Sequence, residues 1–351
     1  MIFWTEMTDR ILAIALLALG VGTGAVLGQP QPRTVFKERV KLSDQEIQNI
    51  EQGQVITKVL SSSDKYGLLV FGAVYVNAPV EKFAAAFRDV KKLKENKVYL
   101  DVQEFSPGGA PPKVSDFERL SLDNKDIDQL HTCKPGECDI QIFDDIQVFQ
   151  SKVNWNSPDK YVQANQLLRQ RVTDGMTLYM KGGLKSLGSY RDREKPFNLY
   201  QATKDMIDGS FYLPQDRAGG IYRHVTEYPN GKLAGAEDFF YWEKINFGQE
   251  PTVRLNHVSI FPTGFGAAKL LIANKQVYSS RYMRMALQMF YCVPDTEKPG
   301  KPGFFLIEMN DSRLPDFGAL KLAIVRKVAT GKALDATRDT LTMFAARLNG
   351  K

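Results

Sequence analysis

Between residues 239 and 310 the sequence is a succession of long apolar segments rich in β-branched and aromatic residues, and this succession limits the fold more than any other feature. The segments span 239–247, 253–261, 277–293 and 304–310, and turn-forming residues separate them. The charged loop 295–303 joins the last two as antiparallel neighbours. An earlier segment, 66–76, is apolar on both faces. The pattern therefore predicts a large, mainly antiparallel sheet that is covered on both sides.

Helical patterns interrupt and follow these strands. A C-terminal helix is predicted at about 316–348, because apolar residues recur there at helical spacing. They are Leu320, Ile324, Val328, Leu334, Leu341, Phe344 and Leu348. A second helical region is predicted at about 123–213, whereas 114–122 and the residues from 222 onward have the composition of strands. The predicted fold class is α+β: a curved antiparallel sheet gripped by a long C-terminal helix, with a helical insertion.

Composition bounds the domain organisation. The chain has 351 residues, of which 43% are hydrophobic and 25% charged, as in globular proteins. We expect a polar linker at 29–42 and a single domain over 43–351. The net charge is +6 and is spread along the chain, so clusters such as 91–97 and 191–195 favour solvated faces. Contact with anionic lipid headgroups is the alternative. No nucleic-acid motif is present, and no nucleic-acid partner is expected.

The N-terminus predicts export. Residues 11–28 are almost wholly apolar, follow Arg10 and end at Gln29-Pro30-Gln31-Pro32. This layout matches a signal peptide cleaved after Gly28. Its length also approaches that of a bilayer span, so an uncleaved anchor is the alternative. In both cases the remaining chain would lie outside the cytoplasm, in the periplasm or the extracellular space. Translation could start at Met1 or at Met7, since starting at Met7 removes Glu6 from the charged region.

The chain has three cysteines. Cys133 and Cys138 flank Lys134-Pro135-Gly136-Glu137, and a Pro-Gly turn can bring the two thiols together. In an oxidising compartment this spacing predicts a disulfide, although a redox-active pair is the alternative. No neighbouring residues complete a metal site, and no metal is expected. Cys292 lies in an apolar strand and is predicted to be a buried thiol.

Counting side chains with a period of two selects candidate ligand-binding residues. One face of the segment 281–293 carries Met283, Met285, Leu287 and Met289. Thioether side chains are flexible and polarizable, so this face suits the wall of an adaptable apolar pocket; a filled core is the alternative. His257 lies on the apolar face of the neighbouring segment. It would be the polar anchor of such a pocket or a hydrogen-bonded core residue. Tyr241 and Trp242 complete the candidate set, as pocket-edge or core residues.

The sequence lacks the short motifs of several enzyme classes. There is no G-x-S-x-G elbow, H-E-x-x-H, P-loop, G-x-G-x-x-G or EF-hand loop. His224 and Glu227 have helical ligand spacing, but their segment has strand composition, so it indicates no metal site. The pair Glu237-Asp238 would point to opposite faces of a strand. No cofactor is predicted, and His257 is the only weak candidate for an acid or base.

The order of elements resembles the START-like superfamily, the helix-grip fold that includes polyketide cyclases and plant pathogenesis-related allergens. The resemblance rests on Val74-Tyr75-Val76-Asn77-Ala78-Pro79, where a strand enters a helix through Ala-Pro, and on the antiparallel strands and closing helix that follow. It covers about 66–105 and 222–348, with 123–213 as an insertion. It implies a curved sheet whose final helix encloses an apolar cavity. It implies no shared catalytic residue.

Three functional hypotheses follow. The first is an exported carrier that binds a lipid-like or other apolar small molecule between the sheet and the C-terminal helix. The second is an enzyme that uses the same cavity, of a cyclase or hydrolase type, with His257 as general acid or base. The third is a structural or partner-binding envelope protein whose helical insertion forms the interface; exposed apolar residues there would favour it.

Overall fold

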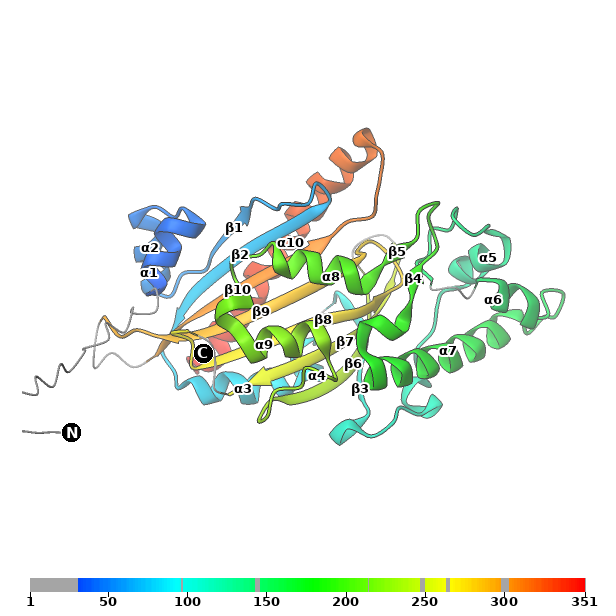
Figure 1. Cartoon of the computed structure of the whole chain (residues 1–351), viewed down its shortest axis with the longest axis horizontal. Coiled ribbons are helices and arrows are strands. Elements are labelled where there is room, and N and C mark those ends of the chain that lie inside the picture. Colours follow the sequence, from blue (N-terminus) through cyan, green and yellow to red (C-terminus); the bar gives the residue numbers. More distant parts are fainter. Residues whose placement is uncertain are drawn as a thin grey trace, which may run out of the picture.

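An eight-stranded antiparallel sheet forms the centre of the molecule, in the order β1-β2-β10-β9-β8-β7-β6-β3 (Figure 1). This computed structural model describes residues 31–95, 97–142, 146–213, 215–246, 250–262, 266–297 and 303–350; the predicted signal peptide or anchor at 1–28 lies outside them. The strands are β1 (Ile56–Leu60), β2 (Gly67–Val76), β3 (Tyr99–Phe105), β6 (Glu237–Ile245), β7 (Thr252–Phe261), β8 (Leu270–Ser279), β9 (Met285–Pro294) and β10 (Phe304–Arg313). A separate hairpin pairs β4 (Ser189–Tyr190) with β5 (Phe197–Asn198).

One side of the sheet, here called the α10 face, packs against α3 (Val80–Arg88), α4 (Val90–Leu93) and α10 (Ala319–Leu348). Phe83 and Phe344 meet at 4.8 Å between ring centroids, over Phe290 of β9. A side chain at Gly72 would lie 2.5 Å from Thr337 of α10. The absence of a Cβ at this position therefore allows the helix to approach β2 closely.

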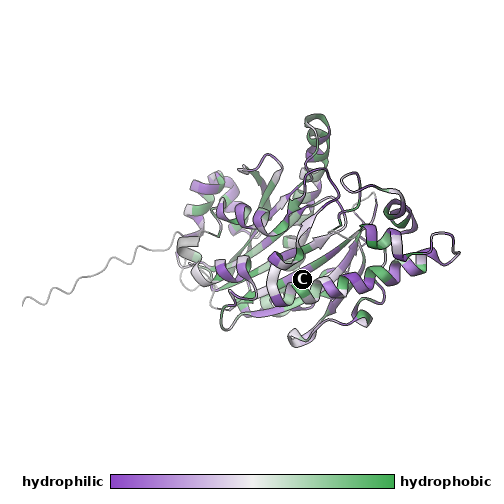
Figure 2. Ribbon diagram, turned by 45° about the vertical axis from the view of Figure 1, so that its right-hand side comes forward, coloured by the Kyte–Doolittle hydropathy of each residue, from purple (hydrophilic) through white to green (hydrophobic). Residues whose placement is uncertain are grey.

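The opposite side, the α8 face, is covered by the helices of the insertion and by the N-terminal helices. In Figure 1, α7, α8 and α9 lie in front of the sheet and α10 lies behind it. The strands carry much of the hydrophobic sequence, whereas the helices mix both kinds of residue (Figure 2). The helices concerned are α1 (Pro32–Val35), α2 (Asp44–Glu51), α5 (Asn124–Thr132), α6 (Ile146–Lys152), α7 (Lys160–Gly182), α8 (Leu199–Asp208) and α9 (Gln215–Glu227).

The predicted fold class is confirmed. The sheet is antiparallel and the chain ends in a long helix, so the molecule is an α+β protein with the helix-grip arrangement of sheet and C-terminal helix. A helix-rich segment lies between β3 and β6, as the sequence indicates. Among the described residues, no helix combines the length and the hydropathy that a bilayer span requires.

The expectation of a polar linker at 29–42 is wrong for its described part. Residues 32–35 form α1, and Phe36–Val40 continue it as a π-helical turn. Phe36 is fully buried and contacts the rings of Phe71 and Phe305 edge-on, each at 5.7 Å. The sequence prediction missed this buried phenylalanine because the residues around it are charged. One of them, Arg33, forms ion pairs with Glu51 and Asp295, so it belongs to the folded domain and not to a solvated linker.

Two segments with strand composition are not strands. Residues 114–122 contain the 3₁₀ turn Val114–Phe117, whose Phe117 is buried. Residues 222–227 form the end of α9. Tyr222 and Val225, three positions apart, are both buried in the core of the α8 face. Their burial on one helical side outweighs the weak β-propensity of this segment.

The predicted disulfide is present. Cys133 and Cys138 are bonded, with 5.2 Å between their Cα atoms. The bond closes the turn after α5, and Cys138 is buried in the core beneath α7. Cys292 is a buried free thiol, as expected.

Candidate functional site

The candidate residues chosen from the sequence do not surround one cavity. Met285, Leu287, Met289, Trp242 and His257 belong to the α8 face, whereas Tyr241 belongs to the α10 face. Met283 precedes β9, and its carbonyl accepts a hydrogen bond from Gln141 at 2.9 Å. Met285 and Met289 are thus covered by the helices on the α8 face and not by α10. This arrangement contradicts the expectation of a cavity between these methionines and the C-terminal helix.

Most of these side chains are packed into the core. Leu287, Met289 and Trp242 are fully buried, and the Trp242 indole donates to the carbonyl of Asp116 at 3.1 Å. Met285 differs, because it also lines a cavity of about 350 Å³. That cavity, here called the α8 pocket, lies between α8 and the end of the sheet where β2 begins and β10 ends.

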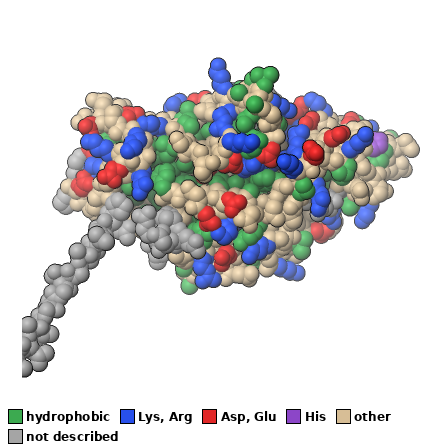
Figure 3. Space-filling view, turned by 45° about the horizontal axis from the view of Figure 1, so that its top comes forward, with side chains coloured by type: hydrophobic (Ala, Val, Ile, Leu, Met, Phe, Trp, Pro, Cys, Tyr) green, Lys and Arg blue, Asp and Glu red, His purple; other side chains and the backbone are tan. Residues whose placement is uncertain are grey.

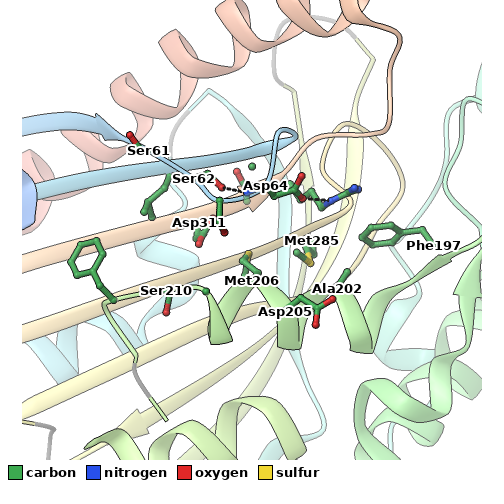
Figure 4. Close-up of a pocket in the computed structure, with 17 residues that line it drawn as sticks. Ser61, Ser62, Asp64, Phe197, Ala202, Asp205, Met206, Ser210, Met285 and Asp311 are labelled. Carbon is green, nitrogen blue, oxygen red and sulfur yellow. Dashed lines mark hydrogen bonds and ion pairs between the residues drawn. The ribbon is translucent and has the colours of Figure 1, made fainter. Parts of the chain in front are cut away.

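The walls of the α8 pocket come from segments far apart in the sequence. Figure 4 shows Ala202 and Met206 of α8 facing Met285 and Asp311 of the sheet. The loop between β1 and β2 closes one side. The apolar lining consists of Leu69, Phe197, Ala202, Met206, Phe211 and Met285, and the polar lining includes Ser61, Ser62, Asp64, Asp205, Asp311 and Arg313.

Strand pairing explains why Asp311 and Arg313 share this pocket. In β10, Asp311 lies opposite Leu69 of β2 and Leu287 of β9, and Arg313 lies opposite Gly67 and Met285. Alternate residues of a strand point to the same face, so both polar side chains point to the α8 face beyond the last buried apolar residue, Met309. The sequence prediction ended this strand at residue 310 and missed them.

Asp311 is a buried acid with unused bonding capacity. Its Oδ2 accepts from the hydroxyl of Tyr212 at 2.9 Å, while Oδ1 has no hydrogen-bond partner among the described residues. Burial raises the pKa of Asp311 to about 7. Near neutral pH this carboxyl therefore exists in both protonation states and can accept or donate a hydrogen bond.

Arg313 supplies a positioned cation. Its Nε donates to Asp64 at 2.6 Å and its Nη2 to Asp316 at 2.7 Å. The guanidinium lies 4.9 Å from the ring centroids of both Tyr66 and Phe197. Nη1 has no hydrogen-bond partner among the described residues. Two carboxylates and two rings thus hold the group in place and leave the Nη1 amino group free to donate.

His257 lies outside the α8 pocket, in a buried network that the sequence prediction missed. Oδ1 of Asp238 is close to His224 Nε2 (2.9 Å), His257 Nε2 (3.0 Å) and Ser259 Oγ (2.8 Å). The hydroxyl of Tyr179 lies 2.7 Å from His257 Nδ1. His224 belongs to α9, so the network ties that helix to β6 and β7.

The protonation pattern identifies this network as structural hydrogen bonding. The backbone N–H of Leu233 donates to His224 Nδ1 at 3.0 Å, so the neutral ring carries its proton on Nε2, facing Asp238. These two histidines and the aspartate lie close enough to share a cation. In this tautomer, however, His224 Nε2 has no lone pair to offer a metal, so the geometry does not fit a metal centre.

The pKa values agree with this interpretation. Burial lowers the pKa of His257 to about 4, against the raising effect of Asp238. Burial opposes ionisation of Asp238, but hydrogen bonds from the two histidines outweigh it and hold the pKa of that carboxyl far below its usual range. Lys275, opposite His257 on β8, donates to the carbonyl of Val225 at 2.7 Å. Its pKa is lowered by burial to about 7.

Comparison with known proteins gives partial structural similarity. No protein-family model matches the chain, and no curated protein matches it. A START superfamily protein from Mycobacterium smegmatis is 19% identical, with 35% of this chain and 70% of that chain covered and a TM-score of 0.22. The Zhui aromatase/cyclase from Streptomyces sp. R1128 is 10% identical, with 42% and 86% covered and a TM-score of 0.24. The di-domain aromatase/cyclase of the steffimycin biosynthetic pathway is 11% identical, with 54% and 57% covered and a TM-score of 0.22. Each of these similarities covers only part of both chains.

Proposed function

We propose that this protein is an exported carrier that holds one amphipathic small molecule in the α8 pocket. The observation that carries the proposal is that the pocket contains both apolar side chains and polar atoms without hydrogen-bond partners among the described residues. The polar atoms are Asp311 Oδ1 and Arg313 Nη1, and the apolar side chains include Phe197, Met206 and Met285. Ligand sites are typically cavities of this size in which a few polar groups fix the orientation of an apolar ligand. Export is supported by the apolar N-terminal segment and by the disulfide.

The charge of the lining favours a neutral ligand head. Asp64, Asp205 and Asp311 outnumber Arg313, so a carboxylate ligand would meet net negative charge. A head with hydroxyl and carbonyl oxygens can accept from Arg313 and donate to Asp311 without this repulsion. The apolar tail would gain about 25 cal/mol for each Å² that it buries. We therefore assign the ligand to the class of neutral amphipaths, such as monoacylglycerols.

The enzyme alternative has less support. His257 is 1% exposed, does not line the α8 pocket, and has both ring nitrogens within hydrogen-bonding distance of buried partners. The interface alternative would rest on Val162 and Leu178 of α7, which are 56% and 50% exposed. At 1.5 Å per residue they lie about 24 Å apart along the helix, so they form two isolated positions rather than a patch.

Calorimetric titration tests the ligand assignment. We expect the wild-type protein to bind monodecanoylglycerol, and to bind decanoate more weakly, with a further loss as the pH rises through the pKa of Asp311. The variant Arg313→Met should bind monodecanoylglycerol roughly tenfold more weakly or worse, because it removes a charge-assisted hydrogen bond. Ala202→Trp, which fills the cavity from α8, should abolish binding of both probes.

Matched controls separate these effects from general damage. Arg338→Met removes an exposed arginine of α10, and Ala336→Trp adds an indole to an exposed position of the same helix. Both should bind like the wild type. Equal binding by Arg313→Met and the wild type, or binding that survives Ala202→Trp, would contradict the proposed site.

A further inference from the structure

The two halves of α10 have different surroundings. In the second half Leu341, Phe344 and Leu348 are buried against the α10 face. In the first half Leu320, Ile324 and Val328 are 79%, 61% and 56% exposed. The sequence predicted one continuous stripe buried against the sheet. The first half instead projects beyond the sheet, and Figure 3 shows hydrophobic side chains on the projection at the top of the molecule.

The exposed residues form one continuous stripe, here called the α10 stripe (Leu320, Ile324 and Val328). Positions four apart lie on the same side of a helix, so the three side chains stand in a row. The helix is held in this orientation by Arg326, whose guanidinium donates to the carbonyls of Lys65 and Gly67 in and beside the loop between β1 and β2. The stripe is therefore presented outward on an anchored helix.

The charges beside the stripe are all positive. Between Asp316 and Asp335 the sequence has no acidic residue, but it contains Lys321, Arg326, Lys327 and Lys332. Lys321, Lys327 and Lys332 are exposed. A helix with an apolar stripe and basic flanks fits the interface of an anionic bilayer, where the apolar side chains enter the acyl region and the ammonium groups meet lipid phosphates.

We propose that the first half of α10, residues 319–332, docks on the surface of an anionic membrane through the α10 stripe. A second copy of this chain fits the stripe less well than a membrane does. A symmetric contact between two copies would bring the exposed lysines beside each stripe together, and these like charges would repel. Gly67, whose carbonyl accepts from Arg326, also lines the α8 pocket. Arg326 lies two positions from both Ile324 and Val328, on the opposite side of the helix from the stripe, so docking would place α10 between the membrane and this loop at the edge of the pocket. The proposal does not require a ligand in the pocket.

Vesicle co-sedimentation of the protein expressed from the full sequence tests the proposal. Mass spectrometry identifies its N-terminus, which must be the same in all variants that are compared. We expect binding to vesicles of equimolar phosphatidylcholine and phosphatidylglycerol, weaker binding to phosphatidylcholine alone, and a decrease at high salt. Ile324→Asp and the double variant Leu320→Asp/Val328→Asp should bind roughly tenfold more weakly or worse. Lys327→Glu should weaken binding to the anionic vesicles only.

Leu178→Asp and Val162→Asp are the matched controls, because they place a carboxylate at similarly exposed apolar positions of another helix. They should sediment like the wild type. The proposal is overturned if the wild type ignores anionic vesicles or if the stripe variants bind as well as the controls. It is also overturned if light scattering shows a dimer that Ile324→Asp dissociates, since the occupant would then be a second copy.

Discussion

Replacement of Glu308 by glutamine is expected to raise the free energy of unfolding by roughly 4–5 kcal/mol at pH 8 and to leave it nearly unchanged at pH 4.5. Glu308 of β10 is fully buried on the α10 face. Its Oε1 accepts from Gln288 at 2.7 Å and from Thr337 at 3.5 Å, and Oε2 has no hydrogen-bond partner among the described residues. Burial raises the pKa of Glu308 to about 8, although Gln288, Thr337 and the charge of Lys94 oppose this rise.

The direction of this change in the free energy of unfolding follows from the protons that Glu308 binds in the folded and unfolded states. The folded pKa lies above the unfolded value of 4.5, so between these pH values the unfolded chain loses a proton that the folded protein keeps. The stability contribution of Glu308 is therefore complete below pH 4.5 and is lost as the pH rises to 8, at about 1.4 kcal/mol per pH unit. The glutamine variant should lack this slope.

Urea unfolding at pH 4.5, 6 and 8, which spans the interval between the unfolded and the folded pKa of Glu308, measures this difference in stability. Glu118→Gln, at an exposed position, is the control. A Glu308→Gln protein that keeps the wild-type pH slope, or that is less stable at pH 8, would show that the buried carboxyl is ionised in the folded state.

Removal of the Asp238 carboxylate is expected to lower the free energy of unfolding by about 4 kcal/mol at pH 7, because three buried donors lose their acceptor. Asp238→Ala removes the Oδ1 that His224 Nε2, His257 Nε2 and Ser259 Oγ each contact at 3.0 Å or less. The two Nε2 atoms then have only the weaker contacts to Ser259 Oγ, at 3.1 and 3.3 Å. Since His224 belongs to α9, the loss should also loosen that helix from the sheet.

Hydrogen exchange and urea unfolding of Asp238→Ala test this effect, and Glu237→Ala is the control. Glu237 is the preceding residue of β6, and its side chain is 57% exposed beside Arg88. An exposed pair of this kind contributes at most about 1 kcal/mol. A loss below about 1 kcal/mol in Asp238→Ala, equal to that of the control, would mean that the network adds no stability.

The sequence predicted those parts of the fold whose periodicity is local. β2 follows from a continuous run of β-branched and aromatic residues, and the antiparallel pairing of β9 with β10 follows from the short charged loop between them. Sequence periodicity does not reveal which helix covers which face. Phe344 and Met289 lie in equally apolar segments, yet the first belongs to the α10 face and the second to the α8 face.

The candidate site could be predicted only in part, because it depends on contacts between distant segments. Met285 was identified from its strand alternation and does line the α8 pocket. Arg313 and Asp64, which are 249 positions apart, meet only after β1, β2 and β10 have paired. The sequence does contain a pattern from which the polar lining could have been predicted. Asp311 and Arg313 continue the alternation of the apolar residues in β10, so they point to the same side of the sheet as those residues. Polar residues at the end of a buried strand face are candidates for a pocket.

The most direct test of the carrier account is native mass spectrometry of the protein purified without detergent, for the wild type and for Ala202→Trp. The account predicts that the wild type retains a neutral amphipathic molecule, identified after extraction, and that the cavity-filling variant carries none. Reproducibly empty wild-type protein, or the same bound molecule in both proteins, would contradict a ligand in the α8 pocket.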